Sequence, residues 1–203
     1  MKQIPSGAGM GGGSADAAAV LAGLNRLWRT GLSQHELEAI GLTLGADVPF
    51  CLRGGLTRTT GIGERMASLP CARSWWLVII QPCAALSTRE VFTAYHAQKA
   101  ALRPDTQAAQ SALALGDARL LPASLANVLQ PVSAAMRPQI DEAISALTAQ
   151  GALAALMTGS GSAVFGVFDT PEAALHACSA LLPRWPASSF VCQTCQESLV
   201  FEE

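Results

Sequence analysis

The stretch PSGAGMGGGSADAA, residues 5–18, holds five glycines within seven positions and runs directly into an alanine-rich segment with apolar residues at helical spacing. Ordered glycine loses much conformational entropy, so this density indicates a backbone that approaches something closely or adopts positive φ. Ser14 suits the N-cap of the following helix. A helix N-terminus offers unpaired N–H groups and the positive end of the helix dipole, which attract anions. The stretch therefore predicts a phosphate-binding loop that leads into a helix.

Three other kinds of glycine-rich segment are disfavoured for this stretch. The Walker A pattern, G-x-x-x-x-G-K-[ST], requires lysine where Gly13 stands. The Rossmann pattern is matched by Gly7, Gly9 and Gly12, but it must follow a β-strand, and MKQIPS contains a proline and no hydrophobic run. A flexible linker is disfavoured because the stretch enters an amphipathic helix directly.

Composition narrows the class of protein. Half of the 203 residues are hydrophobic, 14% are charged and the net charge is −2, which predicts a globular chain without nucleic acid or membrane as a partner. The apolar runs are shorter than the roughly 18 residues of a membrane span, and no signal-peptide pattern is present. The six cysteines are mostly scattered singly, which indicates reduced thiols. We expect a cytoplasmic protein, either a monomer or a weak homodimer.

Hydrophobic patterns predict an α+β fold in two domains, residues 1–72 and 73–203, with the boundary within 70–74. In the first domain we expect a second helix from Ser33 to Gly45, an extended segment over 48–60 and a turn at 61–64. The second domain should form a ferredoxin-like layer with helices on one face of an antiparallel sheet. Its expected elements are a strand at 75–81, a helix at 88–101, several short helices within 103–150, strands at 153–157 and 163–168, a helix at 170–182 and a strand at 190–195.

Two further segments suggest chemistry. Asp47 lies in LTLGADVPF, residues 42–50. A turn aspartate is the ordinary interpretation, but downstream of a phosphate loop its carboxylate could accept the proton of an attacking hydroxyl group. The turn TGSGS, residues 158–162, could be a plain hairpin turn or could offer N–H and hydroxyl groups to the same phosphates. Ser14 could cap its helix and also reach a Mg²⁺ ion that bridges those phosphates.

Together these segments resemble the GHMP kinases. The family's phosphate loop, P-x-x-x-G-L-G-S-S-A-A, is similar to residues 5–18. The blocks LNRLW, LGADVPF, GIGE and MTGSGSAVF follow in the family's order over essentially the whole chain. The resemblance implies a partial N-terminal S5-like domain, a C-terminal ferredoxin-like domain and an ATP-dependent kinase.

The resemblance also assigns residues to ligands. It implies that Asp47 is the catalytic base, and that Thr88 and Phe92, in LSTREVF, hold the cytidine part of the substrate 4-diphosphocytidyl-2-C-methyl-D-erythritol. Ser14 is the candidate ligand of Mg²⁺. The residues expected to bind ATP are Pro5, Ser6, Gly7, Ala8, Gly9, Met10, Gly11, Gly12, Gly13, Ser14 and Ala15, joined by Gly159, Ser160 and Gly161.

The sequence also departs from the family's pattern. The family's N-terminal motif P-A-K-[IL]-N-L, with its lysine, is not in this sequence, and neither is the Tyr-His pair that follows it. We therefore expect a chain that lacks the first strands of the N-terminal domain, with low stability and impaired kinase activity. Residues 127–130, NVLQ, keep part of the family's Asn-Asp-Leu-Glu. The alternatives are another GHMP small-molecule kinase and a non-catalytic nucleotide-binding remnant.

Overall fold

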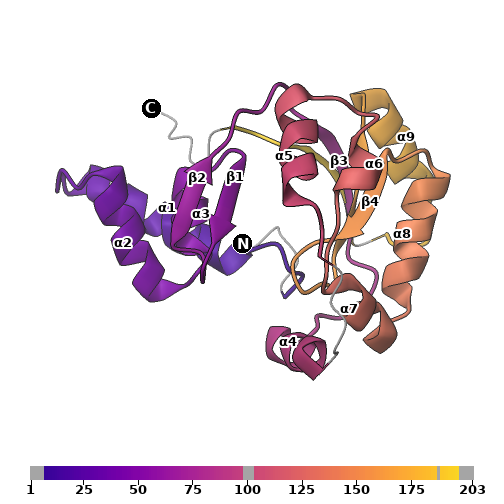
Figure 1. The fold of residues 1–203 in the computed structure, drawn as a ribbon, viewed down its shortest axis with the longest axis horizontal. Coiled ribbons are helices and arrows are strands. Elements are labelled where there is room, and N and C mark those ends of the chain that lie inside the picture. Colours follow the sequence, from indigo (N-terminus) through magenta and orange to yellow (C-terminus); the bar gives the residue numbers. More distant parts are fainter. Residues whose placement is uncertain (1–6, 98–102, 187, 197–203) are drawn as a thin grey trace. The chain divides into compact units, whose positions relative to one another are not determined.

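Figure 1 shows the computed structural model, which describes residues 7–97, 103–186 and 188–196. The chain forms two compact units. The larger unit contains residues 7–10 and 72–194, and the smaller unit contains residues 11–71 and 195–196. The chain passes from the larger unit to the smaller one between Met10 and Gly11. The expected domains, 1–72 and 73–203, stay a prediction.

The larger unit is built on a four-stranded antiparallel sheet. Its strand order is β4 (Ala154–Met157), β5 (Val164–Phe168), β3 (Trp76–Ile80) and β6 (Ser189–Gln193). The central strand β3 pairs with both β5 and β6, so that Val78 lies opposite Gly166 on one side and Val191 on the other. This order and these directions confirm the ferredoxin-like layer predicted from the sequence.

Two helices cover one face of this sheet (Figure 1). Helix α8 (Gln139–Ala149) contacts β4 and β5, and α9 (Pro171–Leu181) contacts β3 and β6. Each helix repeats buried apolar residues at helical spacing, and these pack with fully buried Val78 and Ile80 of β3. They are Ile140, Ala143 and Leu147 in α8 and Ala174, Ala177 and Leu181 in α9.

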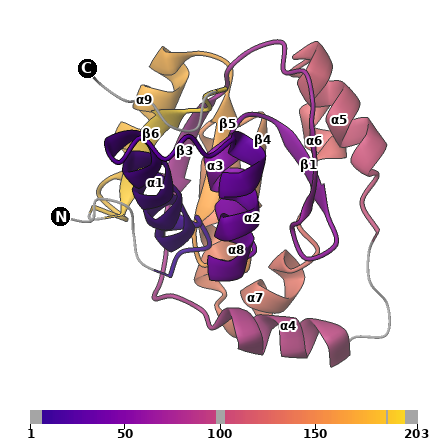
Figure 2. The same ribbon diagram turned by 90° about the vertical axis from the view of Figure 1, so that its left-hand side faces the viewer.

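The expectation of helices on one face of the sheet is wrong, because helices also pack on the opposite face, around a second, smaller apolar cluster. Helices α5 (Thr106–Leu115) and α6 (Leu121–Ser124) place Ala112 and Leu121 against Trp75, Leu156 and Val167. Figure 2 shows α4 (Thr88–Ala97) and α7 (Gln130–Met136) together at one end of the sheet, where they contact each other. The prediction of several short helices within 103–150 is confirmed. Of the helix expected at 88–101, residues 98–101 lie outside the described residues.

The smaller unit contains three helices and a hairpin in its described residues. They are α1 (Gly12–Leu27), α2 (Gln34–Leu44), α3 (Val48–Arg53) and the strands β1 (Thr57–Thr60) and β2 (Arg65–Ser68). Ala18, Leu37, Val48 and Leu52 form the core that joins the helices. The helix expected from Ser33 to Gly45 is present as α2, and Ser33 caps it in a capping box with Glu36.

Two local expectations are wrong. Ser14 does not cap the first helix, because α1 begins two residues earlier, at Gly12. Its N-cap is Gly11 in the left-handed conformation, φ 64°, which glycine adopts without strain. Residues 48–60 are not extended throughout, since residues 48–53 form α3. Proline in the first turn is compatible with a helix, and Val48 and Leu52, four residues apart, bury the same helix face.

An ion pair with a buried carboxylate joins three elements of the smaller unit. Arg53 of α3 donates to both carboxylate oxygens of Glu38 in α2, over 2.9 and 2.6 Å, and donates to the Met66 carbonyl oxygen of β2 over 3.1 Å. The Glu38 side chain is 8% exposed. Burial alone would raise the pKa of Glu38, but hydrogen bonds from Arg53 and Gln34 outweigh burial, and the pKa is lowered.

Replacing Arg53 by methionine should lower the free energy of unfolding by about 3 kcal/mol, because the buried Glu38 carboxylate loses its only ion-pair partner among the described residues and keeps the hydrogen bond from Gln34. Denaturant titration measures this loss. The control is Arg119→Met, which breaks a similar pair with Asp117 in which the arginine side chain is 88% exposed. We expect almost no change there. Equal effects of the two variants would contradict a special role for the buried pair.

Acid should weaken the smaller unit partly through Glu38. A carboxyl group whose pKa is lowered by folding stabilises the folded chain above its ordinary pKa, 4.5, and this stabilisation is lost as the pH falls through the lowered pKa. We therefore expect Glu38→Gln to be less stable than the parent at neutral pH, with a difference that shrinks in acid. Unfolding titrations at a series of pH values test this. A difference independent of pH would refute it.

Candidate functional site

The first part of the glycine-rich loop is bound to the turn at residues 158–162. The Ala163 N–H donates to the Ala8 carbonyl oxygen over 3.1 Å, and the Thr158 hydroxyl donates to the Gly9 carbonyl oxygen over 3.0 Å. Ala8 is 2% exposed. These two segments lie about 150 residues apart in the sequence, and each was predicted from its glycines to bind phosphate. They therefore meet in the larger unit.

The contact between these two segments requires glycine on both sides. A Cβ atom placed on Gly9 would lie 2.4 Å from the Thr158 carbonyl oxygen, and a Cβ atom placed on Gly159 would lie 2.9 Å from the Gly9 carbonyl oxygen. Both residues also have positive φ, 76° and 55°. In this part of the loop glycine allows backbone to pack directly on backbone.

The turn itself is closed by its own hydrogen bonds and by two serine hydroxyl groups. The Gly161 N–H donates to the Thr158 carbonyl oxygen over 2.9 Å. Ser162, fully buried, donates its hydroxyl to the Cys83 carbonyl oxygen. The hydroxyl of Ser160, a residue 7% exposed, lies 2.9 Å from the Thr88 hydroxyl. A predicted substrate residue, Thr88, thus contacts a predicted phosphate-binding residue, Ser160.

Phe92 lies one helical turn after Thr88, on α4. It is 42% exposed, and its ring centroid is 6.2 Å from that of His96. An aromatic side chain this exposed is compatible with the predicted contact to a nucleobase.

The second part of the loop forms the start of α1 in the smaller unit. The first helical bond runs from the Ala15 N–H to the Gly11 carbonyl oxygen, over 2.9 Å, and no side chain caps the helix. The N–H groups of Gly12, Gly13 and Ser14 precede this bond. A Cβ atom placed on Gly11 or Gly13 would meet nothing within 4 Å, so the space beside these residues is open. An uncapped helix start with open space is suited to an anion.

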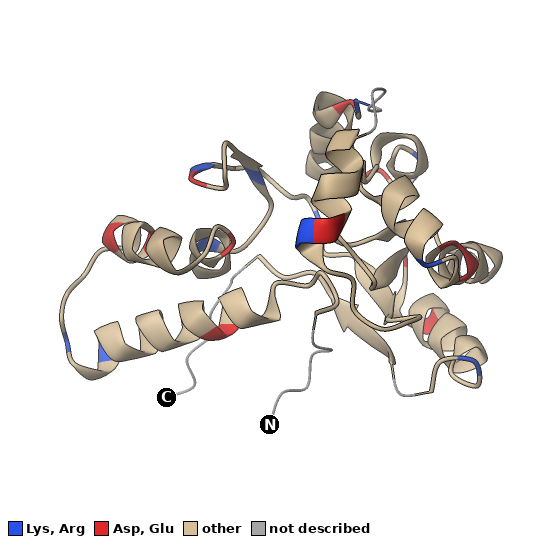
Figure 3. Cartoon of the chain, turned by 90° about the horizontal axis from the view of Figure 1, so that it is seen from below, with Lys and Arg blue, Asp and Glu red and all other residues tan. Residues whose placement is uncertain are grey.

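No charged side chain belongs to this loop. The first charged residue of the described chain is Asp16, and Figure 3 shows the charged positions dispersed along the chain. An anion at the loop would therefore be held by backbone N–H groups and the helix dipole, without an ammonium or guanidinium group from residues 7–15.

Asp47 directly precedes α3, in the smaller unit. Its side chain is exposed and makes no capping hydrogen bond to the helix. Burial raises the pKa of the Cys51 thiol, one turn further on, and the negative charge of Asp47 raises it as well. Val48, the next residue, shares a core with Ala18 of α1. Asp47 thus stands at a helix start without serving the helix as a side-chain cap.

The structure divides the predicted site residues between the two units. Pro5 and Ser6 lie outside the described residues. The larger unit contains Gly7, Ala8, Gly9, Met10, Thr88, Phe92, Gly159, Ser160 and Gly161, and the smaller unit contains Gly11, Gly12, Gly13, Ser14, Ala15 and Asp47.

Sequence reasoning assigned no role to three polar residues that hold the turn. Asn127, Gln130 and Ser133 make side-chain hydrogen bonds to backbone groups of residues 157–160. The one available signal was the partial match of residues 127–130 to the family's Asn-Asp-Leu-Glu. It gave no indication of which backbone groups these side chains contact.

Two kinds of feature are absent from the described residues. They contain no group of three His, Cys, Asp or Glu side chains that could hold a metal ion. None of the helices in the same part of the chain combines the length and the hydrophobicity of a membrane span.

Two domains of a known protein family match this chain. Residues 1–55 match the N-terminal domain of GHMP kinases, and residues 109–186 match the C-terminal domain of GHMP kinases. The chain is 42% identical over 166 residues to 4-diphosphocytidyl-2-C-methyl-D-erythritol kinase of Latilactobacillus sakei, covering 82% of this chain and 58% of that protein. The chain spans about 60% of the length of the curated relatives that it matches.

Solved structures give the same result. The crystal structure of a 4-(cytidine 5'-diphospho)-2C-methyl-D-erythritol kinase matches with a TM-score of 0.80 and 33% identity, over 95% of this chain and 68% of that one. Homoserine kinase from Cytophaga hutchinsonii matches with a TM-score of 0.79 at 21% identity, over 97% of this chain and 69% of that one, which shows a shared fold.

Gly9→Ala should destabilise the larger unit strongly. Alanine at positive φ costs about 1 kcal/mol or more by itself, and the added methyl group would also collide with the Thr158 carbonyl oxygen. Gly151→Ala is the matched control, because Gly151 has φ 86° and open space at the Cβ position. Denaturant unfolding should show the larger loss for Gly9→Ala. Equal losses would mean that the contact with the turn contributes nothing.

Proposed function

The chain belongs to the GHMP kinase family, among its 4-diphosphocytidyl-2-C-methyl-D-erythritol kinases, and on this premise we propose that its protein phosphorylates that substrate. The reaction transfers the γ-phosphoryl group of ATP to the 2-hydroxyl group of 4-diphosphocytidyl-2-C-methyl-D-erythritol, a step of non-mevalonate isoprenoid synthesis. One observation supports the proposal most: the glycine-rich loop packs backbone to backbone on a second glycine-rich turn and ends in an uncapped helix start.

In this proposal ATP is bound by backbone groups. Residues 5–15 and the turn residues Gly159, Ser160 and Gly161 are the proposed contacts to its phosphates. Because residues 7–15 carry no charged side chain, N–H groups and the dipole of α1 provide the attraction. Such groups need no reorganisation when negative charge moves from the γ-phosphoryl group onto the β,γ-bridging oxygen of the leaving ADP, which favours phosphoryl transfer.

Ser14 is the proposed protein ligand of Mg²⁺. Mg²⁺ in such sites is held mainly by phosphate oxygens, with one or two protein oxygen atoms and water. The residues present fit this arrangement, because Ser14 is half-buried at the start of α1 and its hydroxyl does not cap the helix. The ion would supply positive charge to the phosphates.

Asp47 is the proposed general base. A carboxylate can accept the proton of the attacking hydroxyl group, or orient that group toward the phosphorus atom. Its exposed position and its lack of a capping role leave both oxygen atoms available. Thr88 and Phe92 are the proposed contacts to the cytidine part of the substrate, with the exposed Phe92 ring stacking on the base.

The deciding experiment measures phosphoryl transfer from ATP to 4-diphosphocytidyl-2-C-methyl-D-erythritol, with homoserine and mevalonate as competing acceptors. It uses this chain and the same chain extended at its N-terminus by the corresponding segment of the Latilactobacillus sakei relative. Transfer to the cytidylated acceptor by either form supports the proposal. Transfer only to another acceptor would assign a different GHMP substrate, and ATP binding without any transfer would indicate a non-catalytic nucleotide-binding protein.

Asp47→Asn should lower kcat by about 100-fold to 10,000-fold, the range for loss of a general base, and leave ATP binding unchanged. Steady-state kinetics and calorimetric titration with ATP measure the two effects. Asp117→Asn is the control, because Asp117 is paired with Arg119 and has no proposed role in the reaction. Loss of ATP binding in Asp47→Asn would argue against a purely catalytic role.

A further inference from the structure

Asn127 binds two backbone carbonyl groups at the start of the turn at residues 158–162. Its amide nitrogen donates to the carbonyl oxygens of Met157 and Gly159, each over 2.8 Å. Its amide oxygen accepts from the Leu129 N–H over 2.9 Å, so the side chain is itself fixed in orientation. One amide group therefore holds two carbonyl groups of the turn region in place.

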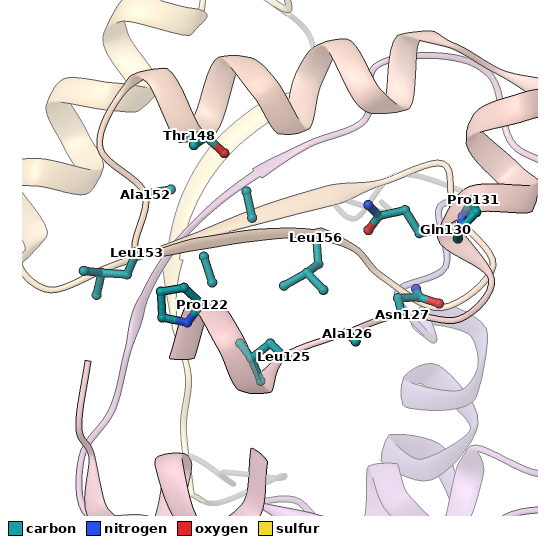
Figure 4. Close-up of a pocket in the computed structure, with 12 residues that line it drawn as sticks. Pro122, Leu125, Ala126, Asn127, Gln130, Pro131, Thr148, Ala152, Leu153 and Leu156 are labelled. Carbon is teal, nitrogen blue, oxygen red and sulfur yellow. The ribbon is translucent and has the colours of Figure 1, made fainter. Parts of the chain in front are cut away.

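Ser133, on α7, holds the next carbonyl group. It is fully buried and donates its hydroxyl to the Ser160 carbonyl oxygen over 3.0 Å. Gln130 accepts from the Met157 N–H over 3.1 Å. Figure 4 shows Asn127 and Gln130 at the same end of a cavity of about 410 Å³, whose wall also includes Leu156 of β4. Three side chains from residues 127–133 thus fix the backbone of residues 157–160.

These bonds determine where an N–H group of the turn points. In a planar trans peptide the C=O and N–H bonds point in opposite directions. When Asn127 binds the Gly159 carbonyl oxygen, the N–H of Ser160 must point away from Asn127. Among the residues that the structure describes, none accepts a hydrogen bond from the Ser160 N–H, although Ser160 is only 7% exposed. A backbone donor in a residue so buried normally has a partner.

We propose that Asn127 and Ser133 are positioning residues for nucleotide binding: Asn127 fixes the peptide plane that contains the Ser160 N–H, and Ser133 fixes the next plane through the Ser160 carbonyl group, so that the Ser160 N–H is presented to a phosphate oxygen. This proposal rests on the proposed function. The carbonyl oxygens carry partial negative charge and would repel a phosphate group, so binding them to Asn127 and Ser133 also keeps them turned from it. The proposal gives a reason for the hydrogen bonds that fix these two side chains on the turn.

The test compares ATP with adenosine, which lacks phosphates, as ligands of the protein. Asn127→Asp keeps the acceptor for the Leu129 N–H but places a carboxylate against two carbonyl oxygens. Ser133→Ala removes the hydroxyl group that donates to the Ser160 carbonyl oxygen. We expect each variant to weaken ATP binding about tenfold and raise the KM for ATP equally, the size of a lost hydrogen bond to a charged group. Adenosine binding, and the KM for the phosphoryl acceptor, should change less than about twofold.

Ser124→Ala is the matched control. Ser124 is also a buried serine of the larger unit, but its hydroxyl donates to the Leu121 carbonyl oxygen, outside the turn. It should leave ATP binding unchanged while lowering the thermal midpoint about as much as Ser133→Ala. If Asn127→Asp does not fold, Ser133→Ala still decides the question.

The outcomes distinguish an error in the proposed function from an error in the positioning role alone. If the unmodified protein binds ATP no more tightly than adenosine, the phosphate-binding part of the proposed function is wrong and the positioning role is wrong with it. If the unmodified protein prefers ATP and both variants keep that preference, only the positioning role is refuted. Equal weakening of ATP and adenosine would show a general structural effect and would also refute it.

Discussion

The close approach of two backbone segments at Gly9 and Gly159 is the constraint on which the candidate site depends. No side chain fits between the segments, and the hydrogen bonds to the Ala8 and Gly9 carbonyl oxygens hold them together. This contact fixes the first part of the loop on the ferredoxin-like layer of the larger unit. The strand pair β4 and β5 carries the turn at its connection, so the sheet core provides the rigid support.

Glycine serves two different purposes along the same loop. At Gly7 and Gly9 it permits contacts that any Cβ atom would block, since a Cβ atom on Gly7 would lie 2.6 Å from the Ala85 side chain. At Gly11 and Gly13 there is open space, and glycine instead leaves the start of α1 uncovered. The first use builds the loop, and the second keeps backbone N–H groups accessible to a ligand.

Much of the fold could be predicted from hydrophobic pattern and capping residues. The strand and helix order of the larger unit and the capped start of α2 were predicted correctly, because period and caps are local signals. The start of α1 was misplaced because Gly11 can act as an N-cap in a left-handed conformation that serine would avoid. The helix at α3 was missed because its burial depends on α1 and α2. Asn127 and Ser133 act on backbone 27 to 32 residues away, a relation without periodicity.

The absence of charged side chains from residues 7–15 has a physical consequence for the proposed nucleotide site. A lysine can follow a phosphate group through several rotatable bonds, whereas an N–H group points only where its peptide plane allows. Binding by N–H groups is therefore sensitive to the rotation of single peptide planes. For this reason, residues that bind the opposite, carbonyl side of those planes influence the ligand without touching it. A site of this kind extends beyond its contact residues, to every side chain that fixes the direction of a contributing peptide.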